Sequence, residues 1–185
     1  AMGAKTSQYS IFGRPGSGLS ERFGEAGALG AMGERVTAEL IEQYLLPHLP
    51  GVRVFYGLKM FPGSDSEADV DFAILYGRKL ALGDTKVWKS GVYTVSDYPG
   101  APEVFVEFED GSETVREVHM NAAADAYLVH LDGRVEVRPF VLVHPPRGEG
   151  VRHEFHNGES NRMRIGSPET VLDEIVGWLV DQPQH

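Results

Sequence analysis

The sequence lacks cysteine entirely: none of its 185 residues is one. A chain without thiols forms neither a disulfide framework nor a thiolate metal site, and a reducing cytoplasm is the expected location. No apolar run approaches the roughly 20 residues that a membrane helix needs, and the start has no signal-peptide pattern. We therefore expect a cytoplasmic globular protein that does not contact a membrane.

Positive charge is also scarce, with 17 Lys and Arg against 27 Asp and Glu and a formal net charge of −10. This balance argues against a protein that coats nucleic acid non-specifically, because phosphate binding is driven by Lys and Arg. It leaves open a local basic groove, or an acidic site that meets phosphates through a bound cation. A scattered cationic surface is the simpler interpretation of the residues that could line such a groove: Arg14, Arg22, Lys89, Arg138, Arg147, Arg152, Arg162 and Arg164.

The chain has the length and composition of one domain preceded by an arm. Residues 1–30 are rich in Gly and Ser without a clear period, which predicts a flexible arm. The stretch "GRPGSG" within them lacks the preceding strand and the Gly-Lys-Ser/Thr of a phosphate-binding loop. Residues 31–185 are expected to form the folded domain.

Hydrophobic periodicity predicts alternating helices and strands without internal repeats, which is typical of an α/β layered domain. Asn121 is positioned to cap the second helix, and Ser167-Pro168 to begin the last one. The expected order is a helix over 31–47, strands at 52–56, 69–76, 79–86 and 92–95, a hairpin of 103–109 with 113–118, a helix at 122–131, a strand at 135–144, a hairpin of 151–156 with 162–165, and a helix from 168.

The strands at 69–76 and 79–86 read as a hairpin that turns at Gly77-Arg78, because Gly supplies the positive φ of a two-residue turn. In this register Asp71 lies directly opposite Asp84, and Asp69 lies opposite Lys86. Both faces of the hairpin are mostly apolar, so we expect helices to cover both. The four charged residues gather at one end of one face.

Two carboxylates facing each other at roughly 5 Å repel, and one of them should have a raised pKa. A divalent cation between Asp71 and Asp84 would remove this conflict, and Lys86 could orient an attacking water or stabilise developing negative charge. The alternative is an Asp69–Lys86 salt pair at the sheet edge, with Asp71 and Asp84 pointing to water. The residues alone leave both interpretations open.

At these positions the sequence resembles the nuclease-related domain (NERD) family of the PD-(D/E)xK restriction-endonuclease-like superfamily. The resemblance covers about residues 30–91. A small-residue helix with Gly-Glu corresponds to Gly33-Glu34, and an Ile-Asp-His type strand to Val70-Asp71-Phe72. The motif of acid-Thr-Lys before an aromatic corresponds to Asp84-Thr85-Lys86 and Trp88.

The resemblance implies a restriction-endonuclease-like three-layer domain, with a central mixed β-sheet flanked by helices. It also implies a phosphodiesterase that depends on Mg²⁺ or Mn²⁺, and we expect its nucleic-acid partner to be DNA rather than RNA. By this resemblance Asp71 and Asp84 hold the metal, Glu34 approaches it from the first helix, and Lys86 serves the attacking water. A homodimer or a partner subunit is compatible with it.

The sequence departs from the family pattern at several positions. Phe72 replaces the usual histidine, Asp84 replaces glutamate, Ala123 stands where a glutamine is common, and Lys89-Ser90 moves the following glycine one place. The missing glutamine and the net negative charge favour the alternative function of an inactive nuclease-fold binding or regulatory module that acts through a partner. A third option, paired carboxylates acting on a glycosidic bond, suits Lys86 poorly.

Other residues have a structural and a functional interpretation. Glu34 could simply favour the positive end of its helix. His153 and His156 are spaced for a helical metal site, but in a strand they point to opposite faces of a surface hairpin. Trp88 could stack on a base or cover the end of a strand, and Trp178 is expected in the core or at an interface.

Overall fold

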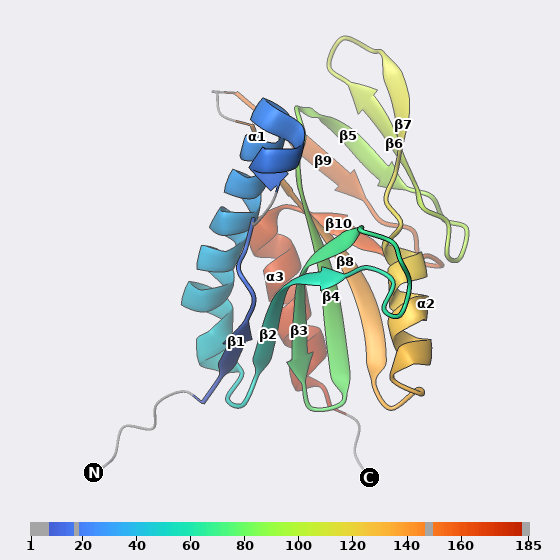
Figure 1. Cartoon of the computed structure of the whole chain (residues 1–185). Coiled ribbons are helices and arrows are strands. Elements are labelled where there is room, and N and C mark those ends of the chain that lie inside the picture. Colours follow the sequence, from blue (N-terminus) through green and yellow to red (C-terminus); the bar gives the residue numbers. More distant parts are fainter. Residues whose placement is uncertain (1–7, 17–18, 147–149, 183–185) are drawn as a thin grey trace.

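Two β-sheets with helices packed around them make up the protein, shown as a computed structural model that describes residues 8–16, 19–146 and 150–182 (Figure 1). The larger sheet contains, in spatial order, β1 (Ser10–Phe12), β2 (Arg53–Lys59), β3 (Asp69–Tyr76), β4 (Lys79–Val87), β8 (Glu136–His144) and β10 (Arg164–Gly166). The smaller sheet contains β7 (Glu113–Glu117), β6 (Glu103–Phe108), β5 (Gly91–Val95) and β9 (His153–His156). The helices are α1 (Leu19–Leu40), continued by short turns over Ile41–Leu45 and Leu46–His48, then α2 (Met120–His130) and α3 (Pro168–Val180).

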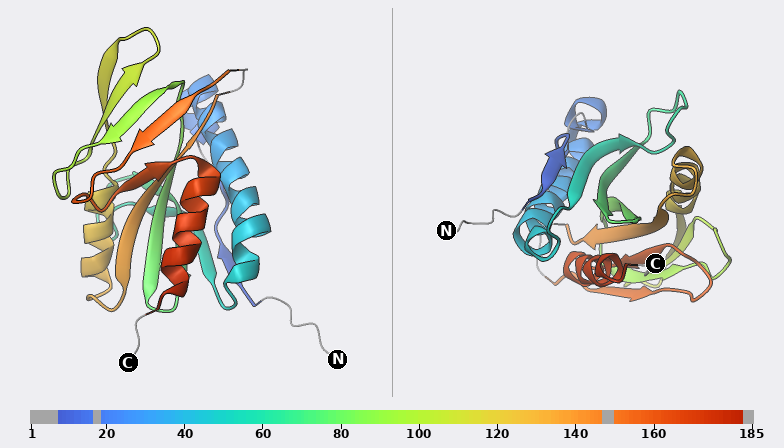
Figure 2. Two further views of the ribbon diagram at one scale, coloured as in Figure 1. Left: turned by 180° about the vertical axis from the view of Figure 1, so that it is seen from behind. Right: turned by 90° about the horizontal axis from the view of Figure 1, so that it is seen from below.

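The larger sheet is mixed and is covered on both faces. Strands β2, β3 and β4 are antiparallel neighbours, whereas β8 runs parallel to β4 and β10 parallel to β8. Helices α1 and α3 cover one face and α2 the other (Figure 2). The hydrophobic runs of β4 and β8 are buried on both sides, as strands enclosed between helices must be. The predicted mixed α/β architecture is confirmed.

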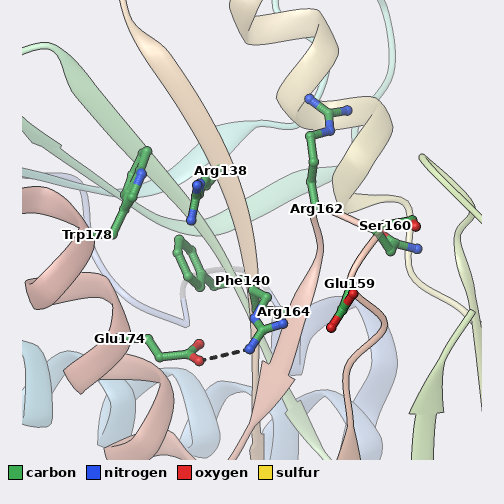
Figure 3. A pocket seen from close by; sticks show the side chains of 9 residues that line it. Arg138, Phe140, Glu159, Ser160, Arg162, Arg164, Glu174 and Trp178 are labelled. Carbon is green, nitrogen blue, oxygen red and sulfur yellow. Dashed lines mark hydrogen bonds and ion pairs between the residues drawn. The ribbon is translucent and has the colours of Figure 1, made fainter. Parts of the chain in front are cut away.

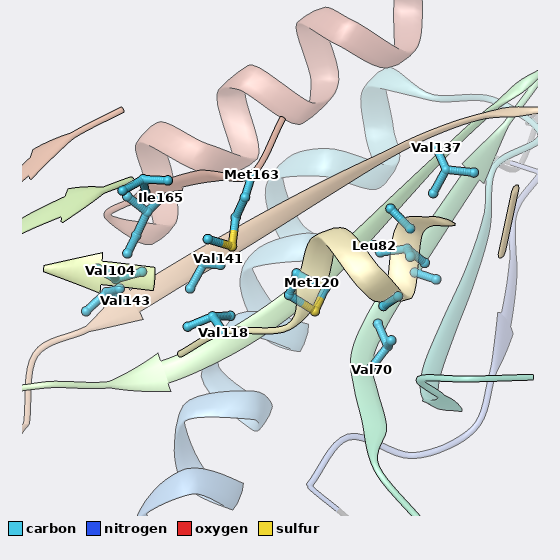
Figure 4. Packing of buried hydrophobic residues seen from close by; sticks show 14 of the residues in the cluster. Val70, Leu82, Val104, Val118, Met120, Val137, Val141, Val143, Met163 and Ile165 are labelled. Carbon is cyan, nitrogen blue, oxygen red and sulfur yellow. The ribbon is translucent and has the colours of Figure 1, made fainter. Parts of the chain in front are cut away.

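One hydrophobic core joins the smaller sheet to the α2 side of the larger sheet. Val104 of β6, Val118 and Met120 beside α2, and Val143 of β8 pack in a single cluster with Met163 (Figure 4). The smaller sheet stands beyond the end of β4, where the chain leaves the larger sheet (Figure 1). It is therefore an extension of the same core.

The beginning of the chain differs from the predicted arm over residues 1–30. Ser10–Phe12 forms a strand that pairs in parallel with β2, and α1 begins at Leu19 rather than near residue 31. Glycines at 24, 27 and 30 lower the helix propensity of this stretch and hid its start. Residues 1–7 and 17–18 of the predicted arm lie outside the described ranges. None of the helices in those ranges has both the length and the apolar character needed to cross a bilayer.

Two other local predictions are wrong. The segments at 151–156 and 162–165 do not form a hairpin, because β9 joins the smaller sheet beside β5 while β10 joins the larger sheet beside β8. Asn121 does not cap α2. Its side-chain amide instead donates to the carbonyl of Ala101 and to Oδ1 of Asn161 at 3.3 and 2.7 Å, which ties the start of α2 to a loop.

Candidate functional site

The β3–β4 hairpin has the predicted register along most of its length. Tyr76 pairs with Lys79 across Gly77, whose φ is +59°, and the pairing continues to Phe72 opposite Gly83. The ladder ends there. The expected direct pairing of Asp71 with Asp84 does not occur, because β3 separates from β4 at this point.

A bend in β3 causes this separation. Phe72 packs on the α1–α3 side of the sheet, whereas Val70 packs on the α2 side, although residues two apart in a regular strand share a face. Asp71 lies between them, where the strand changes direction. The ring of Phe72 lies over Gly83 so closely that a Cβ there would come within 1.9 Å of its Cζ. Only glycine fits beneath this ring.

The side chain of Asp71 occupies the gap that opens between the two strands. Its Oδ2 accepts a hydrogen bond from the backbone N–H of Thr85 at 2.6 Å, in place of the missing ladder bond. On β4, Asp84 is only 7% exposed, and its Oδ2 lies 3.0 Å from Nζ of the half-buried Lys86. Asp84 therefore does not point to water, which contradicts that part of the structural alternative.

Glu34 reaches the same gap from α1. The helix packs close to β4 at Gly33, where a Cβ would lie 2.8 Å from Cγ2 of Val87. Glu34 is only 8% exposed; it hydrogen-bonds with Asp71 and with the backbone of Gly16, yet its Oε2 is buried without a partner. The structure thus brings together all four residues singled out in the sequence. We call Glu34, Asp71, Asp84 and Lys86 the acid site.

Burial and mutual repulsion dominate the electrostatics of the acid site. Burial raises the pKa of Asp71 well above its usual value, and the charges of Asp84 and Glu34 raise it further. Burial likewise raises the pKa of Glu34, against the hydrogen bond with Asp71. The charge of Asp84 raises the pKa of Lys86. The carboxyls of the acid site therefore hold their protons more tightly than exposed carboxyls do.

The donor atoms of the acid site suit a hard cation. Carboxylate oxygens are the ligands that Mg²⁺ prefers, and the unpartnered Oε2 of Glu34 is a buried acceptor that a cation or a proton could satisfy. Nevertheless, over the described ranges no three His, Cys, Asp or Glu side chains are arranged to hold a metal ion. The ligand atoms are of the kind that Mg²⁺ binds, but the described residues do not form a complete set of three ligands around one position.

A buried polar network behind β4 fixes α1 in place. His144, at the end of β8, is 8% exposed, and its Nε2 lies 2.6 Å from Oγ1 of Thr37. Thr85 donates to the same Thr37 oxygen at 3.2 Å. Burial lowers the pKa of His144, which favours the neutral ring. The sequence gives no direct signal for this network beyond polar residues on otherwise apolar elements.

The remaining candidates have structural surroundings. Trp88 stacks on Tyr93 at 5.1 Å, and His153 lies 2.8 Å from the carbonyl of Trp88. His156 is exposed beside Glu154 at 3.1 Å, so the two histidines diverge as a strand requires. Trp178 is partly buried in the core between α3 and β8.

Three of the predicted groove arginines lie together around a pocket of about 380 Å³ between β8, β10 and α3 (Figure 3). Arg162 pairs with Asp125 at 2.7 Å, and Arg164 with Glu174 at 3.1 Å. The guanidinium of Arg138 lies over the ring of Trp178. The carboxylates neutralise much of this positive charge, and the pocket contains no acid-site residue. The side chains of Arg22 and Arg147 lie outside the described part of the chain.

Arg116 of β7 was not singled out in the sequence. Its guanidinium carbon lies 5.2 Å from the ring of Trp88, and its charge opposes the raised pKa of Lys86. It comes to the acid site from the smaller sheet, through a contact between distant parts of the chain that no local pattern indicates.

Comparison with known proteins finds no matching family model, no matching curated protein and no matching solved structure.

Proposed function

We propose that the chain is a metal-dependent nuclease that hydrolyses the phosphodiester bonds of DNA. The observation that carries this proposal is the convergence of Glu34, Asp71 and Asp84 from three elements on one buried gap beside Lys86. The mixed sheet flanked by helices is compatible with the restriction-endonuclease-like fold that the resemblance implies.

The acid site lowers the stability of the folded state, which supports a functional reason for its presence. Two buried carboxyls and the half-buried Asp71 share one gap, and one oxygen of Glu34 has no partner. Such an arrangement costs stability unless protons or a cation compensate the charge. Burial and repulsion that raise carboxyl pKa values are typical of functional sites.

Each side chain has a role in this proposal. Asp71, Asp84 and Glu34 would hold Mg²⁺ or Mn²⁺, which when bound polarises a phosphoryl oxygen and lowers the pKa of water. Lys86, held by Asp84 at 3.0 Å, orients the attacking water or stabilises the charge that develops on the phosphate. The water oxygen bonds to phosphorus while one P–O bond to sugar breaks, and the leaving oxygen takes up a proton.

Lys86→Ala tests the proposal on supercoiled plasmid and single-stranded DNA with Mg²⁺ or Mn²⁺. We expect the substitution to lower cleavage by at least about 100-fold, the typical loss when one charge-stabilising donor is removed. Lys59→Ala is the matched control, because Lys59 is exposed on β2 and donates to the loop carbonyl of Ser64. Thermal melting must show that both variants are folded. Full activity of Lys86→Ala would refute the assignment.

The alternative function is a nuclease-fold binding or regulatory module without turnover. The absence of a formed three-ligand group over the described residues favours it, as does Phe72 at the position of the family's histidine. Calorimetric titration separates the two functions. Heat on addition of millimolar Mg²⁺, together with nicking, supports the hydrolase, whereas neither heat nor nicking supports the binding module.

A further inference from the structure

The two faces of the smaller sheet have different surroundings. In the β6–β7 ladder Arg116 lies directly opposite Val104, and Val104 is fully buried in the core that the smaller sheet shares with α2. Directly opposite residues share a face of a sheet. Arg116 is therefore on the face that packs toward the rest of the molecule, and its neighbours Val115 and Glu117 are on the outer face.

The guanidinium of Arg116 is only partly satisfied in this position. Its Nε is buried and has no hydrogen-bond partner. Within the described residues no carboxylate forms an ion pair with Arg116, and its contact is with the ring of Trp88 at 5.2 Å. Arg116 is half-buried, so its charge is partly removed from water without an acidic partner, and such a position is suited to an anion from outside the chain.

The location of this cation relative to the acid site suggests which anion. Trp88 follows Lys86 by two residues at the end of β4, and the guanidinium of Arg116 lies over its ring. Lys86 is already engaged by Asp84 at 3.0 Å. Arg116 is thus a cation beside the acid site, and the carboxylates of the acid site do not form an ion pair with it.

We propose that Arg116, supported by the ring of Trp88, forms a phosphate-binding subsite for a nucleic-acid strand that lies across the acid site. This inference rests on the proposed function and assigns the subsite to the smaller sheet. The planar guanidinium matches two phosphate oxygens, and stacking on an aromatic ring holds that plane without neutralising its charge. In a chain of net charge −10, a local attraction is needed to bring a phosphate close.

Tryptophan fluorescence can follow binding without catalysis. The chain has two tryptophans, so Trp178→Phe leaves Trp88 as the only one, beside Arg116. In this background we titrate a 12-nucleotide single-stranded DNA in EDTA, where no metal-dependent cleavage occurs. We expect the DNA to change the emission of Trp88 and a methylphosphonate analogue, which lacks the phosphate charge, to change it much less.

The decisive comparison is among arginine variants. Arg116→Gln should weaken binding at least about tenfold. The affinity of Arg116→Lys should lie between those of the parent and Arg116→Gln, because lysine keeps the charge but lacks the planar guanidinium that matches two phosphate oxygens. Arg134→Gln is the control, since Arg134 is exposed beside Asp132 and distant in sequence from the acid site. If Arg116 only supports the fold, its variants will melt at lower temperature and bind DNA as the parent does, which overturns the subsite.

The result is independent of the hydrolase test. DNA binding that depends on Arg116, without plasmid cleavage, supports the subsite and contradicts the nuclease proposal. Cleavage by the native chain with unchanged DNA binding by both Arg116 variants contradicts the subsite and leaves the nuclease proposal intact. No binding of the oligonucleotide by the parent also overturns the subsite.

Discussion

Carboxylates face one another in two regions of this molecule, with opposite surroundings. In the acid site, the buried Asp84 and Glu34 and the half-buried Asp71 share one gap. On the outer face of the smaller sheet, Glu107 pairs directly with Glu113, and both are exposed. The next pair on this face is Phe105 with Val115, and both of these apolar residues are exposed.

The comparison shows that solvent, rather than the number of charges, decides what like-charge contacts cost. Two unit charges 4 Å apart interact by about 1 kcal/mol in water but about 4 kcal/mol at an effective dielectric constant of 20. Water therefore screens the outer glutamates, whereas burial raises the pKa of Asp71. In the acid site the carboxylates repel one another, and a bound ligand can relieve that repulsion. On the outer face, water already screens the repulsion between the glutamates.

Asp71→Asn should break this contrast with the largest effect. The new amide oxygen can still accept from the N–H of Thr85, but the buried repulsion is gone. We expect the free energy of unfolding in EDTA at pH 8 to rise by on the order of 1–3 kcal/mol, a part of the roughly 4 kcal/mol by which two unit charges about 4 Å apart repel at that dielectric constant. Glu107→Gln on the outer face should change it much less. Urea denaturation measures both, and a loss of stability in Asp71→Asn contradicts the interpretation.

The pH dependence of stability should sharpen the contrast. The raised pKa values of Asp71 and Glu34 mean that the folded state binds these protons more tightly than the unfolded chain. Their contribution is full below the usual carboxyl pKa near 4 and is lost as the pH rises through the raised values. The stability of the native chain minus that of Asp71→Asn should therefore fall from pH 4 upward in EDTA. A difference that is flat or rises with pH contradicts the assignment.

Glu107→Lys should have the smallest effect. It replaces a repulsive cross-strand pair with an attractive one opposite Glu113, on an exposed face. We expect a gain of about 0.2–1 kcal/mol in the free energy of unfolding, smaller at high salt because salt screens exposed charges. Denaturation at 0.05 and 1 M NaCl checks it. A gain as large as that of Asp71→Asn would show that burial is not what separates the two regions.

Local patterns predicted the fold well where neighbouring segments pair. The glycine turn at Gly77 and the alternation of strands β3 and β4 were enough to predict the register up to Phe72 opposite Gly83. The sequence did not reveal strands whose partners are distant along the chain. β1 pairs with β2 across about 40 residues, and β9 pairs with β5 across about 60, so neither partner could be read from local turn signals.

The candidate site was predictable in its residues but not in its geometry. The order of the motifs indicated that Asp71, Asp84 and Lys86 belong to one site, and in the structure these residues lie together. The bend in β3 was missed because it depends on a phenylalanine ring lying over a glycine of the next strand. Arg116 and the backbone of Gly16 were missed because they arrive from other elements.

The parallel pairing of β5 with β9 has a consequence for how the chain is made. On a ribosome β5 is complete about 60 residues before β9 is available, which at 5–20 residues per second is a delay of roughly 3–12 s. During that interval the edge of β5 in the β5–β6–β7 meander has no partner. The smaller sheet is therefore complete only after β9 has been made, long after Glu34, Asp71 and Asp84 have been synthesised.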